Sequence, residues 1–325
     1  MNILIYGGGS VGLGLAACLL KSDQRVTIVA RESTCDALRE GGIIREGIFG
    51  RFEAPSSAFS CYSTLEAVPQ GPFDVACVAT KSFDSESAAG DLAAHAERLE
   101  IDAILLCQNG YGNYEVFRRF FPKEAVFNAR VITGFCRPRP NESRITVHAA
   151  PVHVGHLEGV SAEKLIPFCE AVAAGGLPCR VVEDVGKDLW AKILYNGLLN
   201  PLGAIFQVPY GRLGESAHTR FLMRQLAEET FAVMKAVGAS THWDDAGAYL
   251  EAFYGSMLPP TADHESSMLQ DIRAGRRTEI NALNGAVVRL GDDKGVDTPV
   301  NRTVVEQIRF LEERKKKGER LKAKG

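Results

Sequence analysis

The stretch NILIYGGGSVGLGLAACLLK, residues 2–21, decides the fold of the chain. It opens as a short apolar strand, passes through a run of glycines and continues as an apolar helix. Its glycines follow a G-x-G-x-x-G spacing, which permits a tight turn and close approach of the backbone to a ligand, and the helix N-terminus presents N–H groups to a pyrophosphate. A glycine turn without a ligand would not need both flanking elements. The sequence therefore predicts an α/β, Rossmann-type dinucleotide-binding domain whose phosphate-binding residues are Gly7, Gly8, Gly9, Ser10, Val11 and Gly12.

The next strand-like segment, residues 25–30, ends at Arg31. A cofactor without a 2′-phosphate favours Asp or Glu about 20 residues beyond the glycine motif. Arginine instead suits a 2′-phosphate, because its guanidinium makes forked, charge-assisted contacts. The adjacent Glu32 weakens this inference a little. The sequence favours NADP(H) over NAD(H).

Two further apolar strands, residues 74–79 and 104–107, place polar residues at their carboxyl ends. Ligands of open α/β sheets gather outside these ends. We therefore expect Lys81 and Asn109 to meet the cofactor, although a solvated lysine and a turn-forming asparagine remain an alternative. Strand-like sequence continues to about residue 182, and we place the first domain at residues 1–184.

From residue 185 onward the pattern is helical, and we predict an all-α second domain, residues 185–325, that binds substrate and carries the catalytic group. In KDLWAKILYNGLLNP, residues 187–201, Lys192, Asn196 and Asn200 lie four apart and share one stripe of a helix. Apolar residues surround the stripe, and unpaired polar burial costs about 2–7 kcal/mol. We expect a polar site with Lys192 as proton donor, and a helix that kinks or ends at Pro201. The alternative is a stripe that faces solvent.

A second polar helix is expected within residues 266–290, where either serine of SSMLQDIRAGRRTEI, residues 266–280, could cap its N-terminus. Ser267 and Glu279 are twelve residues apart, which is about 18 Å on a straight helix. We therefore expect them to hold different ends of a site. A plain salt bridge from Glu279 to Arg276 is the alternative.

The composition suits a globular protein of two domains, with 325 residues, 46% hydrophobic, 24% charged and a net charge of −3. This balance gives no electrostatic case for nucleic acid. No apolar run is long enough to span a membrane and no secretory signal is evident, so we expect a cytoplasmic protein. The eight cysteines form no C-x-x-C pair and the seven histidines show no ligand spacing, which favours reduced thiols and no metal.

Together these residues resemble the ketopantoate reductase (2-dehydropantoate 2-reductase) family over nearly the whole chain. The blocks that carry the resemblance are the glycine motif with Arg31, Thr80-Lys81, Gln108-Asn109-Gly110, Leu189-Trp190-Ala191-Lys192 with Asn196 and Asn200-Pro201-Leu202, residues 266–271, and Arg277-Thr278-Glu279-Ile280. The resemblance implies NADPH-dependent reduction of 2-dehydropantoate to pantoate, a step of pantothenate biosynthesis towards coenzyme A, with no metal required.

The resemblance also implies a role for each site residue. Lys192 would be the proton donor, and Asn109 would lie between cofactor and substrate. The substrate would contact Asn196, Asn200 and Ser267. The cofactor would contact the glycine motif, Arg31, Lys81, the backbone near Cys136, and Glu279.

Two positions depart from the family pattern: Tyr210, in Pro209-Tyr210-Gly211, where the family often has Pro-Asn-Gly, and His264, where an asparagine is usual. They leave open which small 2-oxo acid is the substrate. A reductase of a different 2-oxo acid is therefore an alternative, and a non-catalytic NADP(H)-binding sensor is a second one that Lys192 argues against. A helical second domain often dimerises, so a homodimer is also an expectation, although the sequence does not specify the oligomeric state.

Overall fold

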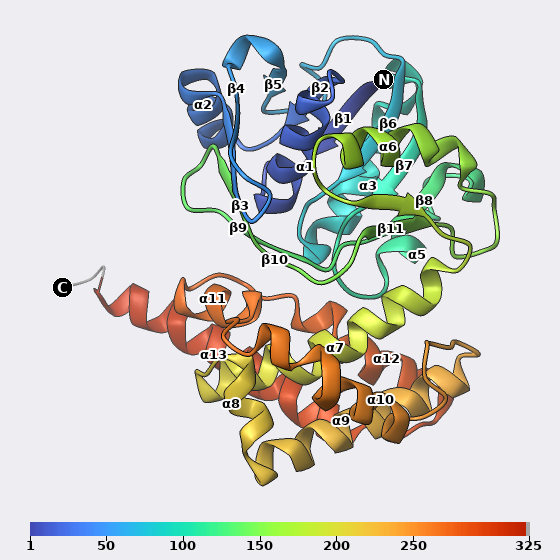
Figure 1. Ribbon diagram of the computed structural model, residues 1–325, viewed down its shortest axis with the longest axis vertical. Helices are drawn as coiled ribbons and strands as arrows, with labels where there is room; N and C mark the ends of the chain where they lie inside the picture. The colour runs from blue at the N-terminus through green and yellow to red at the C-terminus, as the bar shows by residue number, and fades with distance from the viewer. Residues whose placement is uncertain (323–325) are drawn as a thin grey trace. The chain divides into compact units, whose positions relative to one another are not determined.

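The computed structural model describes residues 1–322, and the side chains of residues 1–314 (Figure 1). The chain divides into two compact units. The first contains Met1–Gln108 and Gly112–Val185, and the second contains Asn109–Tyr111 and Gly186–Gly325. A short piece of chain from the middle of the first unit's sequence thus belongs to the second unit.

The first unit is built on an eight-stranded sheet in the order β12-β11-β8-β7-β6-β1-β2-β5. Its pairs are parallel except β8 with β11. The parallel sheet with helical connections confirms the α/β prediction. The strands are β1 (Asn2–Tyr6), β2 (Arg25–Val29), β5 (Ser60–Tyr62), β6 (Phe73–Val78), β7 (Ile101–Leu106), β8 (Val126–Arg130), β11 (Val152–Gly155) and β12 (Cys179–Val181). The helices are α1 (Ser10–Lys21), α2 (Glu32–Gly41), α3 (Ser85–Ala94), α4 (Ala96–Leu99), α5 (Asn113–Phe117) and α6 (Ile166–Ala174).

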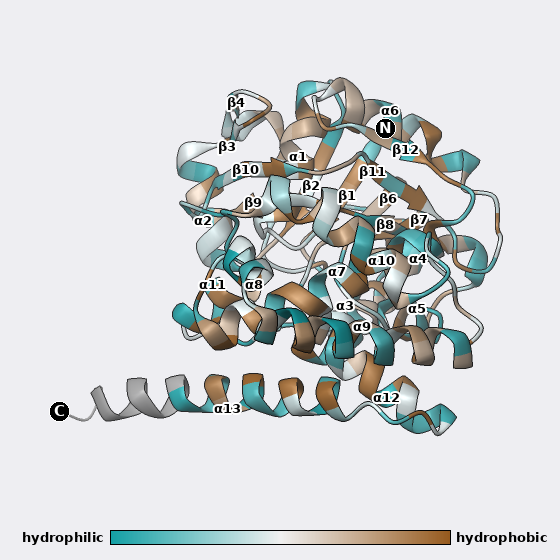
Figure 2. Cartoon of the chain, turned by 60° about the horizontal axis from the view of Figure 1, so that its bottom comes forward, coloured by the Kyte–Doolittle hydropathy of each residue, from teal (hydrophilic) through white to brown (hydrophobic). Residues whose placement is uncertain are grey.

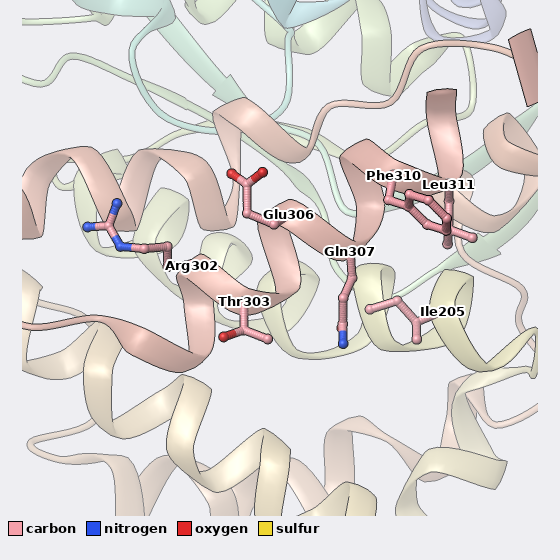
Figure 3. A pocket seen from close by; sticks show the side chains of 7 residues that line it. All are labelled: Ile205, Arg302, Thr303, Glu306, Gln307, Phe310 and Leu311. Atoms are coloured by element: carbon pink, nitrogen blue, oxygen red, sulfur yellow. The ribbon is translucent and has the colours of Figure 1, made fainter. Parts of the chain in front are cut away.

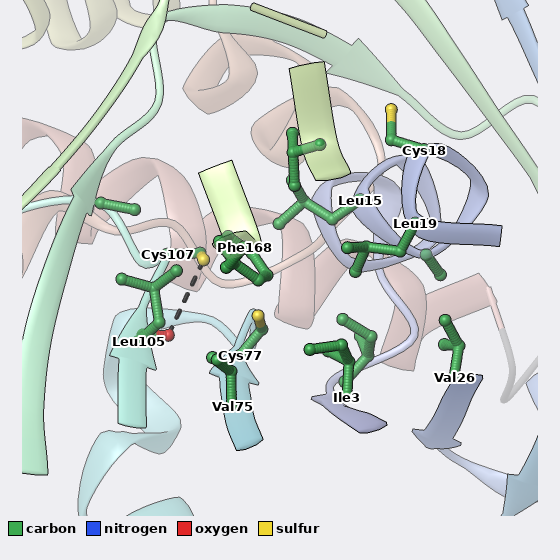
Figure 4. Packing of buried hydrophobic residues seen from close by; sticks show 14 of the residues in the cluster. Ile3, Leu15, Cys18, Leu19, Val26, Val75, Cys77, Leu105, Cys107 and Phe168 are labelled. Carbon is green, nitrogen blue, oxygen red and sulfur yellow. Dashed lines mark hydrogen bonds between the residues drawn. The ribbon is translucent and has the colours of Figure 1, made fainter. Parts of the chain in front are cut away.

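Alternate residues of the central strands face opposite sides of this sheet. Ile3 and Ile5 pack in one apolar cluster with α1 and α6, whereas Leu4 packs in another with α3 and α5. Figure 4 shows the first cluster, where Leu15 and Phe168 meet the strands and two thiols, Cys77 and Cys107, are part of the packing. Truncating a buried ring such as Phe168 costs about 3–5 kcal/mol. All eight cysteines are free.

A smaller sheet in the same unit has the order β4-β3-β10-β9. Its strands are β3 (Ile43–Gly47), β4 (Phe52–Ala54), β9 (Thr133–Cys136) and β10 (Glu142–His148). Helix α1 packs against it: a Cβ on Gly14 would lie 2.5 Å from the ring of Phe135. Strand β9 therefore lies directly against α1, the helix that follows the glycine motif.

The regular elements of the second unit are helices, as predicted. They are α7 (Val185–Phe206), α8 (Tyr210–Glu215), α9 (Ala217–Ala236), α10 (Ala246–Ala252), α11 (Ser267–Arg273), α12 (Asn284–Lys294) and α13 (Pro299–Lys322), with shorter helical turns at Phe253–Met257, Pro259–Thr261 and Ile280–Ala282. Figure 2 shows hydrophilic and hydrophobic residues alternating along α13. Its Val304, Val305 and Ile308 are buried.

The expectation of one helix over residues 266–290 is wrong. Helix α11 ends at Arg273, and the chain turns there because Gly275 adopts φ +67°. The N–H of Gly275 donates to the Ile272 carbonyl (3.1 Å) and that of Arg276 to the Asp271 carbonyl (2.8 Å). These two bonds form the glycine-dependent helix stop known as a Schellman motif. The estimate of about 18 Å between Ser267 and Glu279 therefore has no basis.

Pro201 does not end its helix, contrary to one of the two expected outcomes, because α7 continues to Phe206. A proline leaves the carbonyl four residues earlier without its helical N–H partner. Here that carbonyl, of Gly197, accepts a hydrogen bond from Asn284 Nδ2 at 3.0 Å. Asn284 is itself buried. A side chain from α12 thus replaces the lost backbone donor.

Candidate active site

The glycine motif forms a close turn between β1 and α1 in which Gly7 and Gly12 have no room for a side chain. Gly7 has φ +119°, and a Cβ there would lie 2.8 Å from the Ala79 carbonyl carbon. A Cβ on Gly12 would lie 2.0 Å from the Gly7 carbonyl oxygen. Gly9 is the N-cap of α1 and offers no side chain to cap it. The first-turn N–H groups of α1 are therefore directed at the loop, in the arrangement that suits a phosphate.

Arg31 is the N-cap residue of α2 and is exposed. Its neighbour Glu32 accepts a hydrogen bond from Arg39 Nη1 at 2.9 Å. That bond lowers the pKa of Glu32, so the carboxyl stays ionised and engaged by Arg39. Glu32, the acidic residue beside Arg31, thus forms an ion pair with a cation of its own helix, Arg39.

The other expected nucleotide residues of this unit lie at strand ends. Lys81 is half-buried and precedes a helical turn after β6, and Cys136 is the last residue of β9. Burial raises the pKa of the Cys136 thiol, so the side chain is neutral.

Gln108, which sequence reasoning did not single out, ties the ends of neighbouring strands together. Its Nε2 donates to Thr80 Oγ1 (3.0 Å) and to Ser85 Oγ (2.9 Å). It is buried, and its Oε1 atom has no partner among the described residues. The sequence signal that could have identified Gln108 was its position directly before Asn109, just after β7.

Three of the expected site residues form a hydrogen-bonded chain in the second unit. Lys192 Nζ donates to Asn109 Oδ1 at 2.5 Å, and Asn109 Nδ2 donates to Glu279 Oε2 at 3.1 Å. Lys192 is half-buried, whereas Glu279 is only 7% exposed. The carboxamide of Asn109 therefore links a cation to an anion and fixes the direction of both side chains. The alternative partner of Glu279, Arg276, donates instead to Asp271 Oδ1 at 2.8 Å.

Asn109 reaches this chain because its segment packs within the second unit. The N–H of Tyr111 donates to the Ala282 carbonyl at 2.8 Å, and the Tyr111 ring lies 5.5 Å from the Trp190 ring. Gly110 has φ +84°, and a Cβ there would lie 2.4 Å from the Ala282 carbonyl oxygen. The glycine after Asn109 is thus required by the close approach to the turn at Ile280–Ala282.

Asn200 lies two turns beyond Lys192 on α7 and is buried, and Asn196 between them is half-buried. The Tyr210 hydroxyl donates to Asn200 Oδ1 at 2.6 Å. Burial raises the pKa of Tyr210, which keeps the phenol neutral and able to donate. Tyr210, which departs from the family pattern, therefore contacts Asn200, one of the expected substrate residues, directly.

His264, the second departure, packs edge-on against Tyr210 with ring centroids 5.2 Å apart. Burial lowers its pKa, an effect that the nearby Glu265 opposes in part. Ser266 caps α11, since its Oγ accepts from the Leu269 N–H at 3.0 Å and donates to the Asn200 carbonyl at 3.2 Å. Ser267 is the exposed first residue of α11. The structure thus brings Asn200, Tyr210, His264 and the start of α11 together.

A separate groove of about 660 Å³ in the second unit shares no lining residue with this site (Figure 3). It is lined by Ile205, Arg302, Thr303, Glu306, Gln307, Phe310 and Leu311. Across the described residues, no group of three or more His, Cys, Asp or Glu side chains could hold a metal ion. Within the same part of the chain, no helix combines the length and apolar character that crossing a membrane requires.

Comparison with known proteins places these residues in a family. Residues 3–159 match the model "Ketopantoate reductase PanE/ApbA", and residues 184–312 match "Ketopantoate reductase PanE/ApbA C terminal". The chain is 36% identical to the 2-dehydropantoate 2-reductase of Aquifex aeolicus, over 96% of this chain and 97% of that one. It is 29% identical to the enzyme of the same name from Archaeoglobus fulgidus, over 96% of this chain and 98% of that one. A PanE/ApbA family ketopantoate reductase from Ralstonia eutropha has the same fold, with a TM-score of 0.83, 29% identity and coverage of 97% of this chain and 100% of its own. The chain belongs to the ketopantoate reductase family of oxidoreductases.

Proposed function

We propose that this protein reduces 2-dehydropantoate to pantoate with NADPH, and that Lys192 donates the proton. The observation that carries the proposal is the hydrogen-bonded chain from Lys192 through Asn109 to Glu279. The names of the relatives that match nearly the whole chain supply the substrate.

The reaction needs one proton at the oxygen of the substrate's C2 carbonyl. When bound, NADPH supplies a hydride to the carbonyl carbon. As that C–H bond forms, the electron pair of the C=O bond moves onto oxygen, where an ammonium can stabilise and then protonate it. Lys192 is suited to both tasks, because its bond to Asn109 Oδ1 holds the ammonium in one direction. The Nζ–H bond breaks as the O–H bond of the alcohol forms.

The cofactor assignment draws on the first unit. The turn leaves no room for a Cβ at Gly7, Gly8 or Gly12, and the N-terminal N–H groups of α1 suit a phosphate. Arg31 suits the 2′-phosphate because its guanidinium makes forked, charge-assisted contacts. The carboxylate beside it, Glu32, is engaged by Arg39. We assign Lys81, the backbone near Cys136, Asn109 and Glu279 as further cofactor contacts.

Asn196, Asn200 and Ser267 are proposed to hold the substrate. The Oδ1 atom of Asn200 already accepts from Tyr210, so its Nδ2 group is the end that would donate to a carboxylate or hydroxyl oxygen. Asparagine donors can hold an anionic substrate without competing for the transferred proton.

A second candidate is reduction of a different 2-oxo acid by the same chemistry. It is favoured by Tyr210, which donates to Asn200, and by His264, which packs on Tyr210. The resemblance to the family implies an asparagine at each of these two positions. Two rings in place of two carboxamides would change the shape and polarity offered to the substrate's side chain.

The test is NADPH oxidation by the purified chain with a panel of 2-oxo acids, including 2-dehydropantoate, 2-oxoisovalerate and phenylglyoxylate. The proposal expects the highest kcat/KM for 2-dehydropantoate. A preference of about tenfold or more for another acid, equivalent to about 1.4 kcal/mol, would favour the second candidate. Binding of NADPH without oxidation by any acid would point to a sensor.

A further inference from the structure

Three arginines with different surroundings follow β9: Arg137 and Arg139 in the turn before β10, and Arg144 in β10. Arg139 Nε donates to Glu142 Oε2 at 2.7 Å, and Arg144 pairs with Glu142 at 3.2 Å and with Glu46. Arg137 forms no ion pair with any carboxylate in the described part of the chain. Its Nη2 donates to two neutral oxygens, Thr34 Oγ1 at 2.9 Å and the Pro140 carbonyl.

The contact with Thr34 places Arg137 beside the start of α2. Thr34 is 3% exposed, and its N–H donates to the Arg31 carbonyl at 2.8 Å. Its methyl carbon lies 2.9 Å from the position that a Cβ on Gly8 would take. Arg137 is therefore anchored to a residue that touches both the glycine turn and Arg31.

The charge of Arg31 acts on the Arg137 guanidinium. Burial, and then the charge of Arg31, lower the pKa of Arg137. The half-buried Arg137 nevertheless remains a cation, because an arginine stays protonated in proteins. Its Nε is buried and has no hydrogen-bond partner in the part of the chain described. Two carboxylates of α2, Glu32 and Asp36, are both engaged by Arg39.

Like charges held close together without an anion are unfavourable, and an ion with two negative charges would reverse the sign of the interaction. We propose that Arg137 and Arg31 together bind the 2′-phosphate of NADPH, so that Arg137 is a second determinant of cofactor choice. The proposal rests on NADPH being the cofactor, as proposed above. The competing role is structural: Arg137 would only fasten the turn between β9 and β10 to α2.

The test compares Arg137→Gln with Arg139→Gln, a matched loss of one arginine from the same segment. Glutamine retains an N–H donor for Thr34 or Pro140 but lacks the charge. The dissociation constants of NADPH and NADH are measured by calorimetry or by quenching of intrinsic fluorescence, with thermal unfolding to verify the fold. Arg137→Gln is expected to weaken NADPH binding about ten- to hundredfold, and NADH binding less than about twofold. Arg139→Gln should leave both constants unchanged, since its partner is Glu142.

The outcomes separate this inference from the proposed function. If the unmodified protein prefers NADPH and Arg137→Gln weakens both cofactors equally, or neither, Arg137 is structural and the inference fails alone. If the unmodified protein binds NADPH no more tightly than NADH, both the assignment of NADPH as cofactor and this inference fail.

A further variant, Arg137→Lys, keeps the charge but not the forked geometry. Its preference for NADPH should lie between those of the unmodified protein and Arg137→Gln. A lysine variant no better than the glutamine variant would contradict a role for the charge.

Discussion

Arg31, Lys192 and Asn200 could be proposed as site residues from the sequence because each occupies a position that a local pattern defines. Asn109 and Glu279 could also be proposed, but not their hydrogen bonds with Lys192 and with each other. Asn109 is 83 residues from Lys192 and 170 residues from Glu279 in the sequence, and the carboxamide that joins them depends on packing between distant segments. The choice between the two serines was also open, because Ser266 and Ser267 are equally good caps until burial selects Ser266.

Replacing Arg31 by alanine should reduce the preference for NADPH. The loss of a charge-assisted hydrogen bond to the 2′-phosphate costs about 1.5–3 kcal/mol, or roughly ten- to a hundredfold in affinity. Dissociation constants of NADPH and NADH check this, because only NADPH should be affected strongly. Equal weakening of both would mean that Arg31 acts on the fold of the β2–α2 turn.

Replacing Tyr210 by phenylalanine removes the hydroxyl that donates to buried Asn200 Oδ1. If Asn200 binds substrate, KM for the 2-oxo acid should rise by roughly five- to thirtyfold, which corresponds to about 1–2 kcal/mol. The dissociation constant of NADPH should not change. An unaltered KM in a folded variant would remove Asn200 from the substrate site.

At the level of elements, the strands and most helices follow from apolar runs and helical periodicity. One predicted helix is wrong, and one of the two outcomes expected at Pro201 did not occur, each for an identifiable reason. The helix expected over residues 266–290 stops at Gly275, a signal that was present in the sequence and that the apolar periodicity beyond it outweighed. The possible helix end at Pro201 did not occur because Asn284, from another helix, supplies the missing donor.

Asn284 should therefore stabilise α7 through the Gly197 carbonyl. Replacing Asn284 by alanine leaves that buried carbonyl unpaired and should cost about 1–3 kcal/mol of unfolding free energy. In a Pro201→Ala background the cost should be smaller, because the new N–H of residue 201 can bond to Gly197. Denaturant titration of the four proteins gives the coupling. Equal costs in both backgrounds would mean that Asn284 acts only through Asn301, to which it also donates at 2.9 Å.

For the whole molecule, the order of an α/β unit before a helical unit could be predicted from where alternating strands give way to helical periodicity. A division based on this change of pattern cuts the chain once, at residue 184. Asn109–Tyr111 belongs to the helical unit although it lies within the first unit's sequence, and only its bonds to residues such as Ala282 reveal this.

The pH dependence of global stability should include a contribution from His264. Its pKa is lowered in the folded protein, so the unfolded state binds the proton more readily. The stabilisation is fully present above the unfolded value of about 6.5 and is lost as pH falls through the lower folded value. In His264→Gln, Tm should fall less steeply between pH 7 and pH 5 than in the unmodified protein. Identical profiles for His264→Gln and the unmodified protein would contradict this.

In the proposed mechanism, Lys192 protonates the carbonyl oxygen as the hydride is delivered. The most direct test is kcat for 2-dehydropantoate in Lys192→Ala, measured beside the dissociation constant of NADPH, with Lys192→Arg as a variant that keeps the charge but releases its proton far less readily. General acid catalysis contributes about 10²–10⁴-fold. We expect Lys192→Ala to lose about that factor in kcat and Lys192→Arg to recover only part of it, with little change in NADPH affinity in either variant. A folded Lys192→Ala protein with near-normal kcat would contradict the mechanism.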